Sequence, residues 1–307
     1  MGLTGSNRSN FTGRRQFLKS LLGVGSVLET QPVSAERQVS GDFYWVDLRT
    51  GQIGFPTGTA VKAGLPGSLM KVVAAAVIRD RNILPANHTL ECSGRIVLHK
   101  RSYTCQVAHG AISLTEAIAY SCNVFFAQAA EVIDPAQFLE YAERFGLTDP
   151  VAGFASGPAP TRVQHDAQSY VLGLAPDLKP QGLQLLRMAA LVATHGSLPF
   201  LHSAEEPNPH GQPFNMQLSP PAFAVLNQGM QLACREGTAK NLDPTNRLRL
   251  AAKTGTAPHG NTFQSWIVGY FPYDAPRYAF CARAYQGTSQ DAAVPLAQKF
   301  LFSTEWP

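Results

Sequence analysis

The chain has 307 residues, of which 45% are hydrophobic and 15% are charged, so it is long enough to bury a large core in one or two domains. The formal net charge is +4, but residues 1–35 hold four basic side chains against one acidic side chain. The remainder is close to neutral, which argues against a nucleic-acid partner.

Residues 1–35 have the features of an export signal. They contain the paired Arg14 and Arg15, an apolar run that continues to Leu28, and Val33-Ser-Ala35 as a candidate cleavage site, a pattern that resembles a twin-arginine signal. The apolar run is shorter than the roughly 20 residues that span a bilayer. We therefore expect a periplasmic or otherwise extracytoplasmic protein, with membrane contact only if the signal stays uncleaved. A basic amphipathic helix is the alternative interpretation.

The part that follows begins with a predicted β-hairpin at residues 42–55, where apolar and aromatic residues flank a turn. A helix is expected from Ser68 to about Asp80, because a Pro-Gly pair precedes it and its residues are apolar and Ala-rich. Residues 81–112 are polar, and we expect them to form loops.

The middle of the chain has the pattern of a block of helices. We expect helices at residues 114–120, 124–132, 135–145, 180–195 and 221–234. The first of them starts with Ser113 and Glu116, the spacing of a capping box. The segments 149–180 and 197–220 are rich in Gly and Pro and are expected to be irregular connectors.

Three strands are expected near the end of the chain, at residues 248–256, 262–271 and 277–286, and a last helix at 292–302. This order predicts an α+β fold, in which an antiparallel sheet is built from both chain ends and flanked by helices. A helical subdomain of about residues 80–220 is inserted into the sheet subdomain, so that one domain spans residues 36–307. The junction of the two subdomains is the natural place for a cleft.

Five cysteines are present. Cys92 and Cys105 flank a polar segment and are a possible disulfide, which would contribute about 3 kcal/mol in the chain-entropy model. Cys122, Cys234 and Cys281 have apolar neighbours and are expected to be buried thiols. Because no Cys-x-x-Cys pair or clustered His spacing occurs, the sequence predicts no metal site, and it predicts no cofactor.

Ser68 and Lys71 lie three residues apart in the predicted helix, so their side chains share one face of its first turn. A free serine hydroxyl is a poor nucleophile, and a neighbouring amine that is held neutral can take its proton. Lysine normally titrates near ~10.4, so this role requires burial or a nearby cation to lower the pKa. The apolar neighbours of Lys71 favour such a poorly solvated site.

Two further motifs follow at a distance. Ser121-Cys-Asn123 lies in a predicted turn between helices, and Lys253-Thr-Gly-Thr256 lies at the end of a predicted strand. From Ser68 to Ser121 there are 53 residues, and from Ser121 to Lys253 there are 132. In this order the motifs resemble the Ser-x-x-Lys, Ser-x-Asn and Lys-Thr-Gly elements of penicillin-binding proteins and serine β-lactamases.

The resemblance covers about residues 41–303, and the chain is similar to a penicillin-binding transpeptidase domain of the serine β-lactamase and DD-peptidase superfamily. The other stretches that carry the resemblance are His109-Gly110, Arg144–Leu147, Leu183–Leu185, Gly237–Ala239 and Trp266–Tyr270.

The resemblance implies a set of catalytic roles. Ser68 attacks the carbonyl of a D-alanyl-D-alanine stem peptide of peptidoglycan and forms an acyl-enzyme, and β-lactam antibiotics acylate the same serine. Lys71 accepts the proton of Ser68, and Ser121 relays a proton to the leaving amine. Lys253 sets the local potential, and two close lysines disfavour each other's charged forms. Which of the two is neutral stays open.

The resemblance also implies the substrate contacts. Asn123 hydrogen-bonds the backbone of the substrate, and Thr254 and Thr256 receive the terminal carboxylate together with Lys253. Gly255 has no side chain to keep the substrate off the strand edge. The backbone N–H groups of Ser68 and Thr256 form the oxyanion hole.

A DD-transpeptidase is the favoured function, with a DD-carboxypeptidase or a β-lactamase as alternatives. One class of lactamase uses a glutamate on a loop after Ser-x-Asn, but residues 153–160 hold no carboxylate. Another class replaces the asparagine with an aliphatic residue, which Asn123 argues against. The non-enzyme alternative is a β-lactam-binding sensor or a scaffold. The short chain leads us to expect a small, stand-alone enzyme.

Overall fold

The structure is a computed structural model that describes residues 39–57, 62–203 and 210–306. The predicted export signal at residues 1–35 lies outside these ranges. A search of the described ranges for a helix with the length and hydropathy of a membrane span found none.

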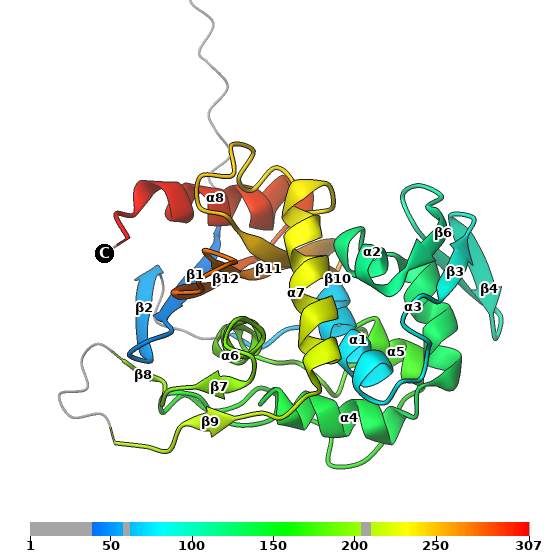
Figure 1. Ribbon diagram of the computed structural model, residues 1–307, viewed down its shortest axis with the longest axis horizontal. Helices are drawn as coiled ribbons and strands as arrows, with labels where there is room; N and C mark the ends of the chain where they lie inside the picture. The colour runs from blue at the N-terminus through cyan, green and yellow to red at the C-terminus, as the bar shows by residue number, and fades with distance from the viewer. Residues whose placement is uncertain (1–38, 58–61, 204–209, 307) are drawn as a thin grey trace, which may run out of the picture. The chain divides into compact units, whose positions relative to one another are not determined.

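A six-stranded sheet takes two strands from the beginning of the described chain, three from near its end and one short strand from its middle (Figure 1). Its order is β10-β11-β12-β1-β2-β8, and its neighbours are antiparallel except for the parallel pair of β2 and β8. The strands are β1 (Gly41–Asp47), β2 (Gln52–Thr57), β8 (His202–Ser203), β10 (Ala251–His259), β11 (Thr262–Phe271) and β12 (Tyr278–Ala284). The predicted sheet is therefore confirmed.

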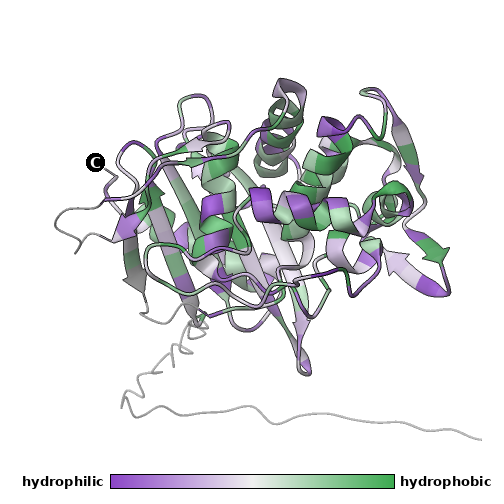
Figure 2. Ribbon diagram, turned by 90° about the horizontal axis from the view of Figure 1, so that it is seen from below, coloured by the Kyte–Doolittle hydropathy of each residue, from purple (hydrophilic) through white to green (hydrophobic). Residues whose placement is uncertain are grey.

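The alternation of side chains along each strand divides the core between the two faces of the sheet. Tyr44 and Val46 of β1 belong to the cluster that includes α6 (Gly182–Ala193). Phe43 belongs to the other cluster, where its ring lies 5.0 Å from that of Phe300 in α8 (Val294–Ser303). Figure 1 shows α6 and α8 on opposite faces of the sheet, and Figure 2 shows that helices and strands carry hydrophobic residues alternating with hydrophilic ones.

Helix α1 (Met70–Asp80) is the central helix of the large cluster, and all of Met70–Ile78 is buried. An apolar helix that is covered all round has no amphipathic stripe, which explains its run of Val and Ala. The predicted start at Ser68 was early by two residues, because Gly67–Leu69 forms a 3₁₀ turn before the α-helix. This turn places Ser68 at the surface end of a buried helix.

The other predicted helices are present with shifted ends. They are α2 (Leu114–Ala119), α3 (Asn123–Ala129), α4 (Pro135–Arg144), α6 and α7 (Pro220–Arg235), and a short α5 (Ala167–Val171) lies in the predicted connector. The capping box of α2 is confirmed, since Ser113 accepts from the backbone of Glu116 and the Glu116 carboxylate accepts from that of Ser113. A π-helical turn at Ser289–Ala293 precedes α8.

The prediction of loops for residues 81–112 was wrong, because four short strands form there. Strand β3 (Thr89–Cys92) pairs with β6 (Gly110–Ser113), and β4 (Arg95–Leu98) pairs with β5 (Arg101–Thr104). The turn between β4 and β5 has positive φ at both His99 (49°) and Lys100 (65°). Such hairpin turns are normally signalled by Asn-Gly, so the His-Lys pair gave no warning.

The connector at residues 197–220 also contains short strands. Strand β7 (Ser197–Leu198) pairs with β9 (Phe214–Asn215), and β8 extends the edge of the main sheet beyond β2.

Candidate active site

The turn that carries Ser68 lies directly against strand β10. Gly67 has a φ of +54°, and a Cβ atom added there would lie 2.2 Å from the carbonyl oxygen of Thr256. The N–H of Gly67 donates to the carbonyl of Gly173 at 3.1 Å. The backbone N–H groups of Ser68 and Thr256 therefore come from two segments that are in close contact, as a two-donor oxyanion hole requires.

We predict that Gly67→Ala destabilises the fold by more than ~2 kcal/mol, because it adds a backbone clash to the roughly 1–2 kcal/mol cost of a left-handed non-glycine residue. Gly260→Ala is the matched control, since Gly260 has a φ of +58° and nothing within 4 Å of its added Cβ. Denaturant unfolding of both variants measures the difference. Equal losses in the two variants would contradict a tight contact at Gly67.

The two buried lysines converge on Ser121. The Nζ atom of Lys71 donates to the carbonyl oxygen of Ser121 at 2.7 Å and to Oδ1 of Asn123 at 2.5 Å. The Nζ atom of Lys253 donates to the hydroxyl of Ser121 at 2.8 Å, and Lys71 approaches the same hydroxyl at 3.4 Å. The hydroxyl of Ser121 therefore lies between two amines and is able to pass a proton between them.

Burial lowers the pKa of both amines. The pKa of Lys71 falls to about 7, since loss of hydration outweighs the opposing effect of Cys122 and Cys105. The pKa of Lys253 is also far below its ordinary value, mainly through burial and further through the charge of Lys71. A group whose pKa lies near neutrality is able both to accept and to return a proton, which suits Lys71 to general base chemistry.

The turn that presents Ser121 is strained and tightly held. Ser121 joins α2 to α3 with a φ of +55°, a conformation that costs a non-glycine residue about 1–2 kcal/mol. Asn123 starts α3, and its Nδ2 donates to the carbonyl of Thr104 at 2.7 Å. The amide of Asn123 therefore links Lys71 to strand β5.

Strand β10 supplies the remaining predicted residues. The hydroxyl of Thr254 donates to that of Thr238 at 2.7 Å, and the hydroxyl of Thr256 accepts from the N–H of Ser289 at 3.0 Å. A Cβ atom on Gly255 would lie 2.5 Å from the carbonyl oxygen of Pro66. Gly255 is therefore needed for the close approach of the Ser68 turn, a reason that the sequence did not reveal.

A groove of about 740 Å³ joins these segments. Six of the predicted site residues line it, namely Ser68, Ser121, Asn123, Thr254, Gly255 and Thr256. Lys71 and Lys253 have 0% exposure and lie beneath its floor, within hydrogen-bonding distance of Ser121. The structure thus brings together all eight residues that the motifs predicted.

Sequence reasoning missed other residues of the groove. Thr238, Tyr120, Glu236, Lys240 and Gln290 also line it. Thr238 orients Thr254, and Gln290 donates to the carbonyl of Thr238. The stretch Gly237-Thr-Ala239 was part of the family resemblance and was the available signal for Thr238. Gln290 lies in a π-helical turn that no sequence pattern indicated.

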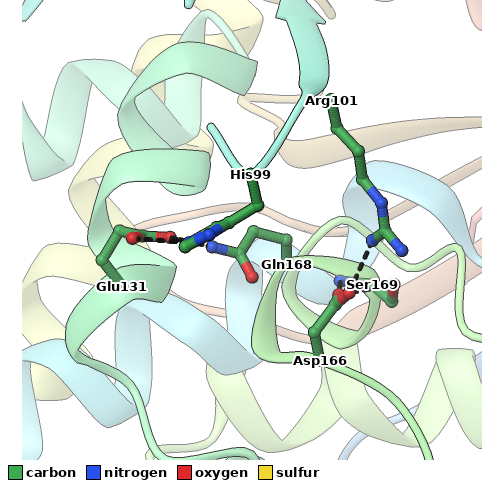
Figure 3. A network of polar contacts seen from close by, with 6 residues as sticks. All are labelled: His99, Arg101, Glu131, Asp166, Gln168 and Ser169. Carbon is green, nitrogen blue, oxygen red and sulfur yellow. Dashed lines mark hydrogen bonds and ion pairs between the residues drawn. The ribbon is translucent and has the colours of Figure 1, made fainter. Parts of the chain in front are cut away.

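The hairpin of β4 and β5 leads into residues 102–107, which line the groove. On its outer side, His99 contacts Glu131 at 2.9 Å and Arg101 contacts Asp166 at 2.5 Å (Figure 3). The histidine and arginine side chains are 71% and 58% exposed, and contacts of this kind add little stability because water screens them. These contacts alone hold the hairpin weakly.

The predicted Cys92–Cys105 disulfide is not formed, and all five cysteines are free. The Sγ atoms of Cys92 and Cys105 lie 3.8 Å apart, and that of Cys122 lies 3.7 Å from Cys105. Nδ1 of His109 lies 3.3 Å from Sγ of Cys92. Four side chains that are able to bind a metal therefore lie together in space, although no Cys-x-x-Cys pair or clustered His spacing marks them in the sequence. Cys122, Cys234 and Cys281 are buried, as predicted.

Comparison with known proteins identifies a curated relative of this chain. The chain is 25% identical over 256 residues to the peptidoglycan D,D-transpeptidase PbpA of Mycolicibacterium smegmatis, with 75% of this chain and 51% of that protein covered. This chain thus spans about half the length of that curated relative.

Solved structures share the fold at lower identity. PBP2 of Pseudomonas aeruginosa in complex with WCK 5153 matches with a TM-score of 0.73 and 20% identity, over 86% of this chain and 72% of the other. PBP2 from Helicobacter pylori matches with a TM-score of 0.73 and 20% identity, over 87% and 61% of the two chains. Residues 54–301 match the model of the penicillin binding protein transpeptidase domain, and the chain therefore belongs to this family.

Proposed function

We propose that this protein is a serine acyltransferase, a DD-transpeptidase that acts on D-alanyl-D-alanine stem peptides of peptidoglycan and is acylated by β-lactams. The observation that carries the proposal is the convergence of three distant segments at one groove, where Ser68 and Ser121 line the surface and Lys71 and Lys253 lie buried beneath it. Membership of the transpeptidase family supports it.

The reaction begins when the hydroxyl oxygen of Ser68 attacks the carbonyl carbon between the two D-alanine residues, while Lys71 accepts the hydroxyl proton. The N–H groups of Ser68 and Thr256 stabilise the oxyanion of the tetrahedral intermediate, at ~3–4 kcal/mol per donor. Collapse breaks the peptide bond. The leaving amine of D-alanine takes a proton that passes from the lysine pair through the hydroxyl of Ser121, which leaves an ester on Ser68.

Substrate positioning falls to strand β10 and Asn123. The terminal carboxylate of the stem peptide binds the hydroxyls of Thr254 and Thr256, close to the charge of the lysine pair. Asn123 already binds Lys71 and Thr104, and it contacts the substrate backbone with its remaining amide hydrogen.

Deacylation by an amine acceptor makes the enzyme a transpeptidase, whereas deacylation by water makes it a carboxypeptidase or a lactamase. Fast attack by water requires a base beside the ester. Among the described residues that line the groove, Glu236 is the one carboxylate, and it interacts with the hydroxyl of Tyr120. This arrangement favours slow hydrolysis and transfer to an amine.

The substrate also fits the expected location. Stem peptides of peptidoglycan are reached outside the cytoplasm, and the twin-arginine-like pattern of residues 1–35 would direct the protein there. N-terminal sequencing of the protein from the producing cells tests this part, and an intact residue 1 would contradict cleavage of the signal.

Mass spectrometry of the intact protein tests the proposed chemistry. After incubation with penicillin we expect a stable adduct on Ser68, and with a D-alanyl-D-alanine peptide and an amine acceptor we expect the transfer product to exceed the hydrolysis product. Rapid turnover of penicillin would instead indicate a lactamase. A stable adduct without any peptide turnover would indicate a sensor or scaffold.

A further inference from the structure

Three thiols and one imidazole lie together beside the Ser-x-Asn turn, and the proposed reaction uses none of them. They belong to Cys92, Cys105, His109 and Cys122, and one ligand atom from each lies within 4.8 Å of all the others. Cys92 and Cys122 are buried, while Cys105 and His109 are partly exposed. A cluster of four soft donors is the usual composition of a structural zinc site.

The spacing of the donor atoms fits a tetrahedral ion. With a Zn–S distance of about 2.3 Å, the edge between two sulfurs of a tetrahedron is about 3.8 Å. The observed Sγ–Sγ distances are 3.8 Å for Cys92 and Cys105 and 3.7 Å for Cys105 and Cys122. A sulfur–nitrogen edge of such a site is about 3.5 Å, against 3.3 Å between Cys92 and Nδ1 of His109.

The contacts of the donors also suit thiolate and imidazole ligands that are held in fixed orientations. The backbone N–H of Asn123 donates to Sγ of Cys105 at 3.2 Å, and that of Phe125 donates to Sγ of Cys122 at 3.3 Å. The ring of His109 stacks on Tyr120 with centroids 5.7 Å apart and an interplanar angle of 18°. Such outer contacts fix the orientation of metal ligands.

We propose that Cys92, Cys105, His109 and Cys122 bind one zinc ion, with three thiolates and Nδ1 of the imidazole as a closed tetrahedral donor set. A disulfide is not needed to explain the convergence of these residues. Thiolates with imidazole select zinc over the hard cations magnesium and calcium, which take oxygen ligands.

The ion ties the groove wall to the catalytic turn. Cys92 ends β3, Cys105 follows β5, His109 precedes β6, and Cys122 is the middle residue of Ser121-Cys-Asn123. The carbonyl of Thr104, next to Cys105, accepts from Asn123. Zinc therefore fixes the inner end of the β4–β5 hairpin, whose outer end depends on the exposed side-chain contacts of His99 and Arg101 (Figure 3).

Metal analysis of the full chain tests the proposal. The protein is purified under reducing conditions without a chelator, and elemental mass spectrometry is expected to find about one zinc ion per chain. Cobalt(II) substitution is expected to give the thiolate-to-metal absorption of a tetrahedral site. A mercurial thiol reagent should release the zinc, which a metal-sensitive dye then detects.

Two matched variants connect the metal to the cluster. Cys105→Ala is expected to weaken zinc binding by more than the ~100-fold that loss of an outer contact costs. Cys234→Ala removes a buried thiol that lies outside the cluster and should keep the full zinc content.

The wild-type measurements decide the proposal even if Cys105→Ala fails to fold. Protein that contains no zinc and shows no cobalt spectrum after supply of either metal would overturn it. A Cys92–Cys105 disulfide that persists in reductant, or equal zinc binding by the two variants, would also overturn it.

Discussion

Ser68→Ala should abolish the penicillin adduct and lower peptide turnover by roughly 10⁴- to 10⁶-fold. The hydroxyl is the one group that forms the ester, and nothing in the alanine variant replaces it. Ser68 is half-buried in a 3₁₀ turn, and its replacement by alanine removes a single oxygen atom and leaves no large cavity. We therefore expect thermal unfolding of the variant to stay close to that of the wild type.

The matched control is Ser197→Ala, because Ser197 is an exposed serine of strand β7, outside the groove. It should form the adduct at the wild-type rate. Peptide mapping of the labelled wild type locates the modified residue. An adduct of the Ser68→Ala variant on Ser121, formed at the wild-type rate, would show that the nucleophile had been assigned to the wrong serine.

Much of the fold follows from local patterns. Strands β10, β11 and β12 were predicted because their apolar residues form continuous stretches between Gly, Pro and polar turns. The Pro-Gly pair before Ser68 and the capping box at Ser113 marked the starts of two helices, and both features reflect backbone groups that the chain must satisfy locally. The sheet then followed from the order of the elements.

The unpredicted parts depend on contacts between distant segments. The β4–β5 turn at His99 and Lys100 adopts positive φ without Asn or Gly, so its strands lacked the usual hairpin signal. Gly255 is required by Pro66, which lies far away along the chain.

The cysteine cluster was missed for the same reason. Its donors are spread from residue 92 to 122 and come together only when β3 pairs with β6 and α3 packs beside them. The presence of Cys122 between the two functional residues of Ser-x-Asn was the available signal. It marked a thiol that necessarily lies next to Ser121 and Asn123 along the chain.

The eight residues of the candidate site could be named from the sequence because their motifs combine spacing with local structure. Their electrostatics could not be predicted, since the pKa of Lys71 depends on complete burial in a core that the sequence outlines only roughly. Burial of both Lys71 and Lys253 is the feature that turns a Ser-x-x-Lys spacing into a reactive arrangement.

Lys71→Met should lower the rate of acylation by about 10²- to 10⁴-fold, the usual contribution of a general base. Methionine keeps most of the buried volume and removes the amine, so the loss reports proton transfer more than packing. In the wild type, the acylation rate should rise with pH through about 7, because protonated Lys71 cannot accept a proton and its pKa lies there. This rise should disappear in the variant.

Lys71→Arg separates a base from a simple positive charge. The guanidinium stays protonated at every accessible pH. If the reaction needs only a positive charge at this position, Lys71→Arg should remain active. If the reaction needs a base there, the variant should lose activity. We expect slow acylation at all pH values. Lys299→Met, which removes an exposed lysine of α8, is the control for lost charge and should keep the wild-type profile. Stopped-flow acylation from pH 5 to 9 measures all four proteins, and Lys71→Arg with a wild-type rate would rule out Lys71 as the proton acceptor.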